Sequence, residues 1–188
     1  NIIGCLYSDL GQFSKAITSL KKVTEINPAY PDIYFNIGNV LRELKNFDAA
    51  IESYNKAILA NPKNYKSHLN LGVTYYENND HESAFRCFKK ALHLNPNNST
   101  IHNNLGNILQ LRKEYQSALK SYKKAIDLNK DNFEAYNNIG LILQIARKYE
   151  LAENYIKKAI YEELELIKKV TRNLPEILIG TMIELPRA

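Results

Sequence analysis

Five glycines recur through this 188-residue chain at a constant spacing of 34 residues, at Gly4, Gly38, Gly72, Gly106 and Gly140. A fixed period of this length indicates a chain built from stacked, nearly identical units. An alanine stands twelve residues after each glycine, and a large apolar residue stands four residues further on. These two columns are Ala16, Ala50, Ala84, Ala118 and Ala152, and Leu20, Tyr54, Phe88, Tyr122 and Ile156.

Each unit carries two short stretches with helical periodicity. In the second unit, Tyr34, Ile37 and Leu41 are spaced by three and four residues and therefore share one helical face, and the stretch from Ala50 to Ala57 has a second such face. Large side chains at the glycine and alanine columns would hold paired helices apart, so we expect these columns to be contact points. Proline cannot continue a helix, and Asn-Pro pairs end the first three units, at Pro28, Pro62 and Pro96.

These columns resemble the tetratricopeptide repeat (TPR) family, whose L-G-x2-Y, A-x3-F and closing-proline pattern is matched by Ile37-Gly38 to Leu41, Ala50 to Tyr54, and Pro62. The resemblance covers roughly residues 1–164. It implies an all-α fold, a right-handed α-solenoid of five TPR helix-turn-helix units. The first unit begins part-way through its opening helix, so the chain is expected to be a fragment or a processed product.

The C-terminal part departs from the repeat. No break separates Leu151 from about Val170, which predicts an extended last helix, and residues 165–188 are expected to form a helix extension and a capping or docking segment. Five apolar residues there share one helical face. They are Leu174, Ile177, Leu178, Met182 and Leu185. We expect this face to cap the open end of the solenoid, with homo-oligomerisation through Leu174–Leu185 as the alternative.

Composition narrows the class of protein only slightly. The net charge of +5 is modest, and no stretch of about 18 uninterrupted apolar residues could span a membrane. Cys5 and Cys87 lie two units apart, too far to predict a disulfide. These features favour a cytoplasmic chain.

No constellation of residues supports catalysis, so the chain is not expected to be an enzyme or to hold a cofactor. His68 and His102 occupy the same column as Tyr34 and Tyr136, four residues before the glycine. A shared aromatic packing position is favoured over metal binding, since a structural metal site needs about four converging ligands.

An asparagine stands two residues before four of the glycines, at Asn36, Asn70, Asn104 and Asn138. We call these four residues the asparagine ladder. By resemblance to the TPR family, whose first helices line a concave groove, the ladder is expected to point into that groove. A carboxamide offers a donor and an acceptor, as an extended peptide backbone does.

Further groove residues are expected at Asn39, Asn103, Asn107, Asn137, Tyr76, Gln110 and Gln144. The pattern is similar to the asparagine ladder in the TPR domains of O-linked N-acetylglucosamine transferases, which grips the backbones of protein substrates.

The residues present argue against a different binding mode of the same family, the carboxylate clamp that binds chaperone C-termini. Its asparagine positions are filled by Asn39 and Asn70, but Phe35, Thr100 and Asn104 stand where the clamp needs cations. Without charge-assisted hydrogen bonds to a terminal carboxylate, no chaperone tail is expected as a partner.

Lysines recur on the second helix of every unit and are expected to form a convex stripe. We call them the lysine column, which comprises Lys21, Lys22, Lys56, Lys89, Lys90, Lys123, Lys124, Lys157 and Lys158. Acidic residues such as Glu52 interleave with them and no aromatic platform accompanies them, so a solvated face is favoured over a nucleic-acid surface.

The sequence therefore predicts a non-catalytic protein-protein interaction scaffold that binds an extended peptide in its concave groove. One alternative is the substrate-recruiting arm of a larger transferase whose catalytic domain is absent from this chain. Another is a self-assembly module acting through the C-terminal segment.

Overall fold

The computed structural model describes residues 2–27, 31–147, 151, 154–158 and 160–161. Nine helices are delimited in this part of the chain, and all its regular structure is helical. They are α1 (Ile2–Asp9), α2 (Phe13–Ile26), α3 (Pro31–Glu43), α4 (Phe47–Ala60), α5 (Tyr65–Glu77), α6 (His81–Leu94), α7 (Ser99–Leu111), α8 (Tyr115–Leu128) and α9 (Phe133–Ile145). The expected capping segment, and the helix extension beyond residue 161, lie outside the described residues.

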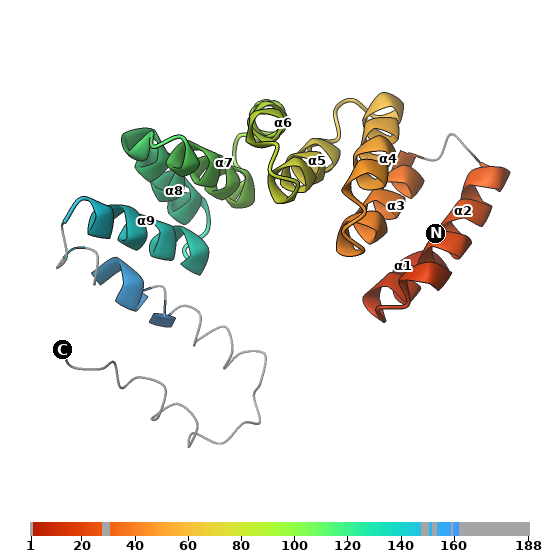
Figure 1. Cartoon of the computed structure of the whole chain (residues 1–188), viewed down its shortest axis with the longest axis horizontal. Coiled ribbons are helices and arrows are strands. Elements are labelled where there is room, and N and C mark those ends of the chain that lie inside the picture. The colour runs from red at the N-terminus through yellow and green to blue at the C-terminus, as the bar shows by residue number, and fades with distance from the viewer. Residues whose placement is uncertain (1, 28–30, 148–150, 152–153, 159, 162–188) are drawn as a thin grey trace, which may run out of the picture. The chain divides into compact units, whose positions relative to one another are not determined.

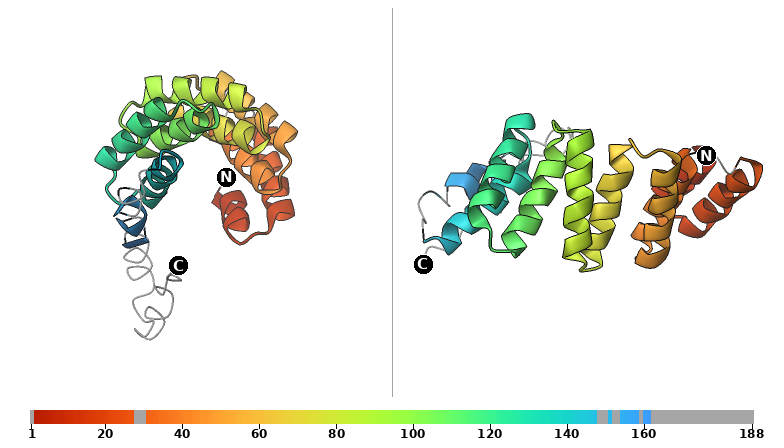
Figure 2. Two further views of the ribbon diagram at one scale, coloured as in Figure 1. Left: turned by 60° about the vertical axis from the view of Figure 1, so that its left-hand side comes forward. Right: turned by 90° about the horizontal axis from the view of Figure 1, so that it is seen from above.

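The chain divides into two compact bodies, Asn1–Leu128 and Asn129–Ala188, of which the first holds α1 to α8 and the second holds α9. In the first body each helix packs on its neighbours in the chain, and the first helices α3 and α5 also contact each other directly. Figures 1 and 2 show these eight helices following one another as antiparallel pairs along an arc. The first body is a solenoid of helix pairs, as the sequence predicts.

The glycine column is a set of contact points between paired helices, which confirms the expectation from the sequence. A Cβ atom built on Gly38 would lie 2.7 Å from Cε1 of Tyr54, and one on Gly72 would lie 2.6 Å from Cε1 of Phe88. At Gly106 the corresponding distance to Cε1 of Tyr122 is 2.5 Å. The ring on the second helix therefore lies directly against the backbone of the first helix, where no larger residue would fit.

The turns between units end the second helices as predicted. The second helices α2, α4 and α6 end at the residue directly before Asn27, Asn61 and Asn95, respectively. Each of these asparagines donates its backbone N–H to the carbonyl oxygen four residues earlier. The Asn61 side chain then accepts the backbone N–H of Lys63 over 3.3 Å. Several asparagines in this chain are thus helix caps and turn residues, which is the role for which this residue type is suited.

Candidate peptide-binding surface

The asparagine ladder lies on the first helices of successive units. Asn36, Asn70 and Asn104 belong to α3, α5 and α7 of the first body, and each side chain is half-buried. Asn138 is half-buried on α9 of the second body. Because α3 and α5 contact each other, Asn36 and Asn70 belong to neighbouring helices of one layer.

A hydrogen-bonded chain of three side chains links the second and third units. The Tyr54 hydroxyl on α4 donates to Oδ1 of Asn39 on α3 over 2.7 Å. Asn70 on α5 donates from Nδ2 to the same Oδ1 over 2.9 Å. The structure therefore brings Asn39 and Asn70 together, and it adds Tyr54, which sequence reasoning assigned only to packing.

The fourth unit repeats the tyrosine contact. The Tyr122 hydroxyl lies 2.8 Å from Oδ1 of Asn107 and 2.9 Å from Oε1 of Gln110, and both oxygens act as acceptors. Asn107 and Gln110 therefore meet on α7, as expected for residues that share one face of the helix.

The third unit has the same ring packing without the polar contact. Phe88 replaces the tyrosine, and Val73 stands where Asn39 and Asn107 stand in the neighbouring units. Asparagine directly follows the glycine only in the two units whose second helix carries tyrosine. This pairing between two columns is a signal in the sequence that could have identified the tyrosine partners.

The buried hydroxyls of Tyr54 and Tyr122 remain protonated hydrogen-bond donors. Both side chains are fully buried, and burial raises the pKa of Tyr54 to about 12 against the smaller opposing effects of Arg42 and Asn70. Burial likewise raises the pKa of Tyr122. A buried hydroxyl without an acceptor would be costly, which explains why each has an amide oxygen beside it.

The remaining expected groove residues differ in exposure. Asn103 is buried, with 2% of its surface exposed, whereas Asn137 and Gln144 on α9 are exposed. The half-buried Tyr76 ring lies 5.5 Å from the His81 ring, measured between centroids. Among the described residues, none forms a hydrogen bond with the half-buried Asn104 side chain. Asn104 is therefore available to a ligand as the structure stands.

The two histidines of the aromatic column bind the turn that precedes their helix. Nε2 of His68 lies 3.1 Å from the carbonyl oxygen of Pro62, and Nε2 of His102 lies 2.9 Å from that of Pro96. In the other two units the column holds Tyr34 and Tyr136, which face lysines. Within the described residues no three His, Cys, Asp or Glu side chains converge as a metal site.

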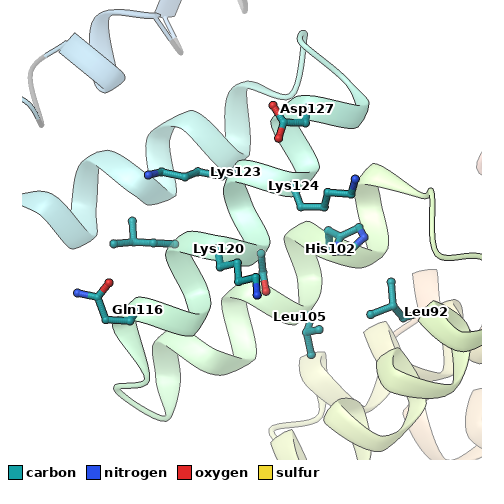
Figure 3. A pocket seen from close by; sticks show the side chains of 10 residues that line it. Leu92, His102, Leu105, Gln116, Lys120, Lys123, Lys124 and Asp127 are labelled. Carbon is teal, nitrogen blue, oxygen red and sulfur yellow. The ribbon is translucent and has the colours of Figure 1, made fainter.

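All described members of the lysine column are exposed. Lys56 forms an ion pair with Glu52 over 2.7 Å, and its Nζ lies 6.0 Å from the centre of the Tyr34 ring. Lys123 and Lys124 line a shallow hollow of about 720 Å³ over α6, α7 and α8, with Leu92, Leu105 and Leu119 among its apolar residues (Figure 3). The hollow contains no member of the asparagine ladder.

Comparison with protein families identifies the class of protein to which this chain belongs. Family models described as TPR repeat match residues 4–42, 38–79 and 107–144. Models described as tetratricopeptide repeat match residues 65–98, 87–120 and 133–164. The chain belongs to the tetratricopeptide repeat family. A search of curated proteins gives no significant match.

Solved structures with the same fold include a crystal structure of MamA, which is 25% identical with a TM-score of 0.77. That alignment covers 88% of this chain and 97% of the MamA chain. Pseudomonas aeruginosa pilF is also 25% identical, with a TM-score of 0.79, over 85% of this chain and 73% of that one. YrrB, described as a TPR protein with an unusual peptide-binding site, is 20% identical with a TM-score of 0.68, over 91% of this chain and 89% of YrrB.

No helix in the described part of the chain is both long and apolar enough to cross a lipid bilayer.

Proposed function

We propose that this chain is a non-catalytic protein-interaction module that binds an extended peptide segment along its first helices. The observation that carries the proposal is the row of half-buried carboxamides, one per unit, on α3, α5 and α7 of the first body. Asn138 has the equivalent position on α9 of the second body. The family to which the chain belongs supports a role in protein-protein interaction. The peptide-binding site in the description of YrrB, a protein of the same fold, is compatible with this proposal.

Each ladder asparagine would bind the main chain of the peptide rather than its side chains. One carboxamide can donate to a peptide C=O and accept from a peptide N–H, so binding would tolerate many sequences. A typical hydrogen bond contributes a net stabilisation of about 1 kcal/mol, so the three rungs of the first body would contribute about 3 kcal/mol, which alone is weaker than millimolar affinity. Tighter binding would therefore require side-chain contacts beside the ladder, for which the expected groove residues Tyr76 and Gln110 are candidates.

The test uses random linear peptides displayed as a library and selected on the unmodified chain. The best selected peptide is then titrated by calorimetry into the chain and into a variant with Asn36, Asn70, Asn104 and Asn138 changed to alanine. We expect the variant to lose roughly tenfold or more in affinity, since several hydrogen bonds disappear together. Circular dichroism of both proteins checks that the fold is retained.

A matched control carries the same number of alanine substitutions on the lysine column, at Lys22, Lys90, Lys124 and Lys157. This variant should bind the peptide with unchanged affinity. Failure to select any peptide, or equal binding by the ladder variant and the unmodified chain, would refute the proposal. Loss of binding in the control alone would indicate that the peptide binds on the face that carries the lysine column.

A further inference from the structure

The hydrogen-bonded chain from Tyr54 through Asn39 to Asn70 acts on one rung of the asparagine ladder. Asn39 Oδ1 receives two donors, the Tyr54 hydroxyl at 2.7 Å and the Asn70 amide at 2.9 Å. The NH₂ group of Asn70, a residue of the third unit, is therefore held by Asn39 of the second unit, whose oxygen also accepts the Tyr54 hydroxyl.

We propose that Tyr54 and Asn39 are positioning residues that fix the orientation of the Asn70 carboxamide and so determine what this rung recognises. With its amide nitrogen turned toward Asn39 and hydrogen-bonded to it, Asn70 has its oxygen left for a ligand. It would therefore accept a hydrogen bond from a main-chain N–H and would discriminate against a peptide that lacks one at that position. This inference rests on the proposed function, and it specifies the polarity of one contact.

A reversed Asn70 amide would place two carboxamide oxygens against each other. The Asn70 oxygen would then face Oδ1 of Asn39, and the hydrogen bond between the two side chains would be lost. The loss of even one hydrogen bond at a part-buried site shifts an orientation equilibrium by roughly tenfold. The observed orientation of Asn70 is therefore strongly favoured over the reversed one.

Asn104 provides the contrasting case within the same molecule. The unit that precedes it carries Val73 and Phe88 in place of Asn39 and Tyr54, so no amide oxygen or hydroxyl stands at the equivalent places. The Asn104 carboxamide can rotate and offer either its donor or its acceptor. The ladder thus combines a rung of fixed polarity at Asn70 with an adaptable rung at Asn104.

The first experiment needs no ligand and uses the side-chain amide signals of the asparagines in a ¹⁵N-labelled chain. In the double variant Tyr54→Phe with Asn39→Val, we expect the Asn70 NH₂ protons to exchange with solvent roughly tenfold faster, because their acceptor on Asn39 is gone. The Asn104 signals should stay unchanged. This double variant reproduces the Phe88 and Val73 pair of the third unit, so it is expected to fold, and Tyr54→Phe alone serves as a milder second variant.

In the reciprocal variant, Phe88→Tyr with Val73→Asn, the NH₂ protons of Asn104 should exchange with solvent more slowly than in the unmodified chain. If the tyrosine had a purely structural role, the unfolding midpoint of both double variants would change. Slow exchange of the NH₂ protons would then be neither lost at Asn70 nor gained at Asn104. Unchanged Asn70 exchange in the first double variant, or unchanged Asn104 exchange in the reciprocal one, would overturn the inference.

The second experiment reads the polarity of the contact. The selected peptide is synthesised with a single N-methyl group at each backbone position in turn, and each version is titrated into the unmodified chain and the first double variant. We expect one position at which N-methylation weakens binding to the unmodified chain roughly tenfold and has a clearly smaller effect on the variant. Identical N-methyl profiles for the two proteins would overturn the inference while leaving the proposed groove intact. If no peptide binds, the proposed function fails, and the amide exchange still decides whether Asn39 and Tyr54 orient Asn70.

Discussion

At the scale of single residues, the columns of the repeat are coupled chemically. A tyrosine on the second helix occurs with an asparagine directly after the glycine, as in Tyr54 with Asn39. Phe88 occurs instead with Val73. The reason is the cost of burying a hydroxyl without an acceptor, which the asparagine oxygen removes.

Removing the Asn39 acceptor alone should therefore lower the free energy of unfolding more than removing both Asn39 and the Tyr54 hydroxyl. Asn39→Val leaves the Tyr54 hydroxyl without its acceptor and should lower the free energy of unfolding by about 1–3 kcal/mol. Adding Tyr54→Phe should recover most of this loss. Asn107→Val should cost less, because Gln110 also accepts the Tyr122 hydroxyl. Urea denaturation measures all three variants, and equal costs for the single and double variants at the Asn39 site would contradict the explanation.

Steric contact at the glycine column should outweigh helix propensity. Gly72→Ala would gain about 1 kcal/mol of helix propensity in an open site. Here the new Cβ would lie 2.6 Å from the Phe88 ring and 3.2 Å from Cβ of Cys87, and overpacking of this kind costs about 1–3 kcal/mol. We expect a lower melting temperature, and the further change Phe88→Ala should then cost less than it does in the unmodified chain. A higher melting temperature for Gly72→Ala would show that the ring moves away freely.

The tyrosine hydroxyls should also make stability fall at alkaline pH. The pKa of Tyr54 is raised to about 12 by burial, whereas an unfolded tyrosine has a pKa of about 10. The folded chain thus binds the Tyr54 proton more tightly, so its stabilising contribution is complete below about pH 10 and is lost as the pH rises towards 12. Tyr54→Phe should flatten this decline in urea unfolding midpoints recorded between those pH values. An identical decline in both proteins would assign the effect to other groups.

At the scale of helices, the same backbone strain occurs at the end of each first helix. Lys45, Asn79, Lys113 and Arg147 have φ values of 56°, 60°, 61° and 56°, and Gly11 occupies the equivalent position of the first unit with φ 68°. This left-handed conformation ends a helix readily when the residue is glycine and costs other residues roughly 1–2 kcal/mol.

Glycine at these helix ends should therefore stabilise the fold. We expect Lys45→Gly and Lys113→Gly each to raise the free energy of unfolding by about 1 kcal/mol. The control Lys90→Gly lies within α6, where glycine should lower that free energy by about 1 kcal/mol. Chemical denaturation distinguishes the two directions, and destabilisation by Lys45→Gly would indicate that its side chain contributes more than the relief of strain.

At the scale of the whole molecule, each unit of a solenoid is stabilised only by its neighbours. Ile37 and Val40 on α3 are 7% and 1% exposed beneath the preceding helix, α2. The equivalent residues of α1, Ile3 and Leu6, are 64% and 56% exposed. α1 therefore buries much less apolar surface than the first helices inside the first body.

This difference should appear as a gradient of hydrogen exchange within the first body. We expect the backbone amides of α1 to exchange fastest and those of α5 to α7 slowest, because local opening costs least where the fewest apolar contacts are lost. Hydrogen-deuterium exchange followed by mass spectrometry of peptic fragments gives the order. Equal protection of α1 and α5 would show that the first body unfolds as one cooperative whole.

The sequence alone was sufficient to predict the helical units, their period, the Asn-Pro helix ends and the tight contact at each glycine. All of these depend on local rules, such as the missing N–H of proline and the missing side chain of glycine, that one 34-residue period repeats. The asparagine ladder was also visible as a column, and its role in binding stays a prediction.

Only the tertiary structure decided which polar groups meet. Asn39 and Asn70 are 31 residues apart, and Tyr54 comes from a helix between them, so the column pattern alone did not indicate that one oxygen receives both donors. Side-chain hydrogen bonds depend on distances of a few tenths of an ångström, which arise from the packing of three helices together. The repeat in the sequence therefore determined where the helices lie in the chain, and their packing determined which of the ladder amides are already engaged.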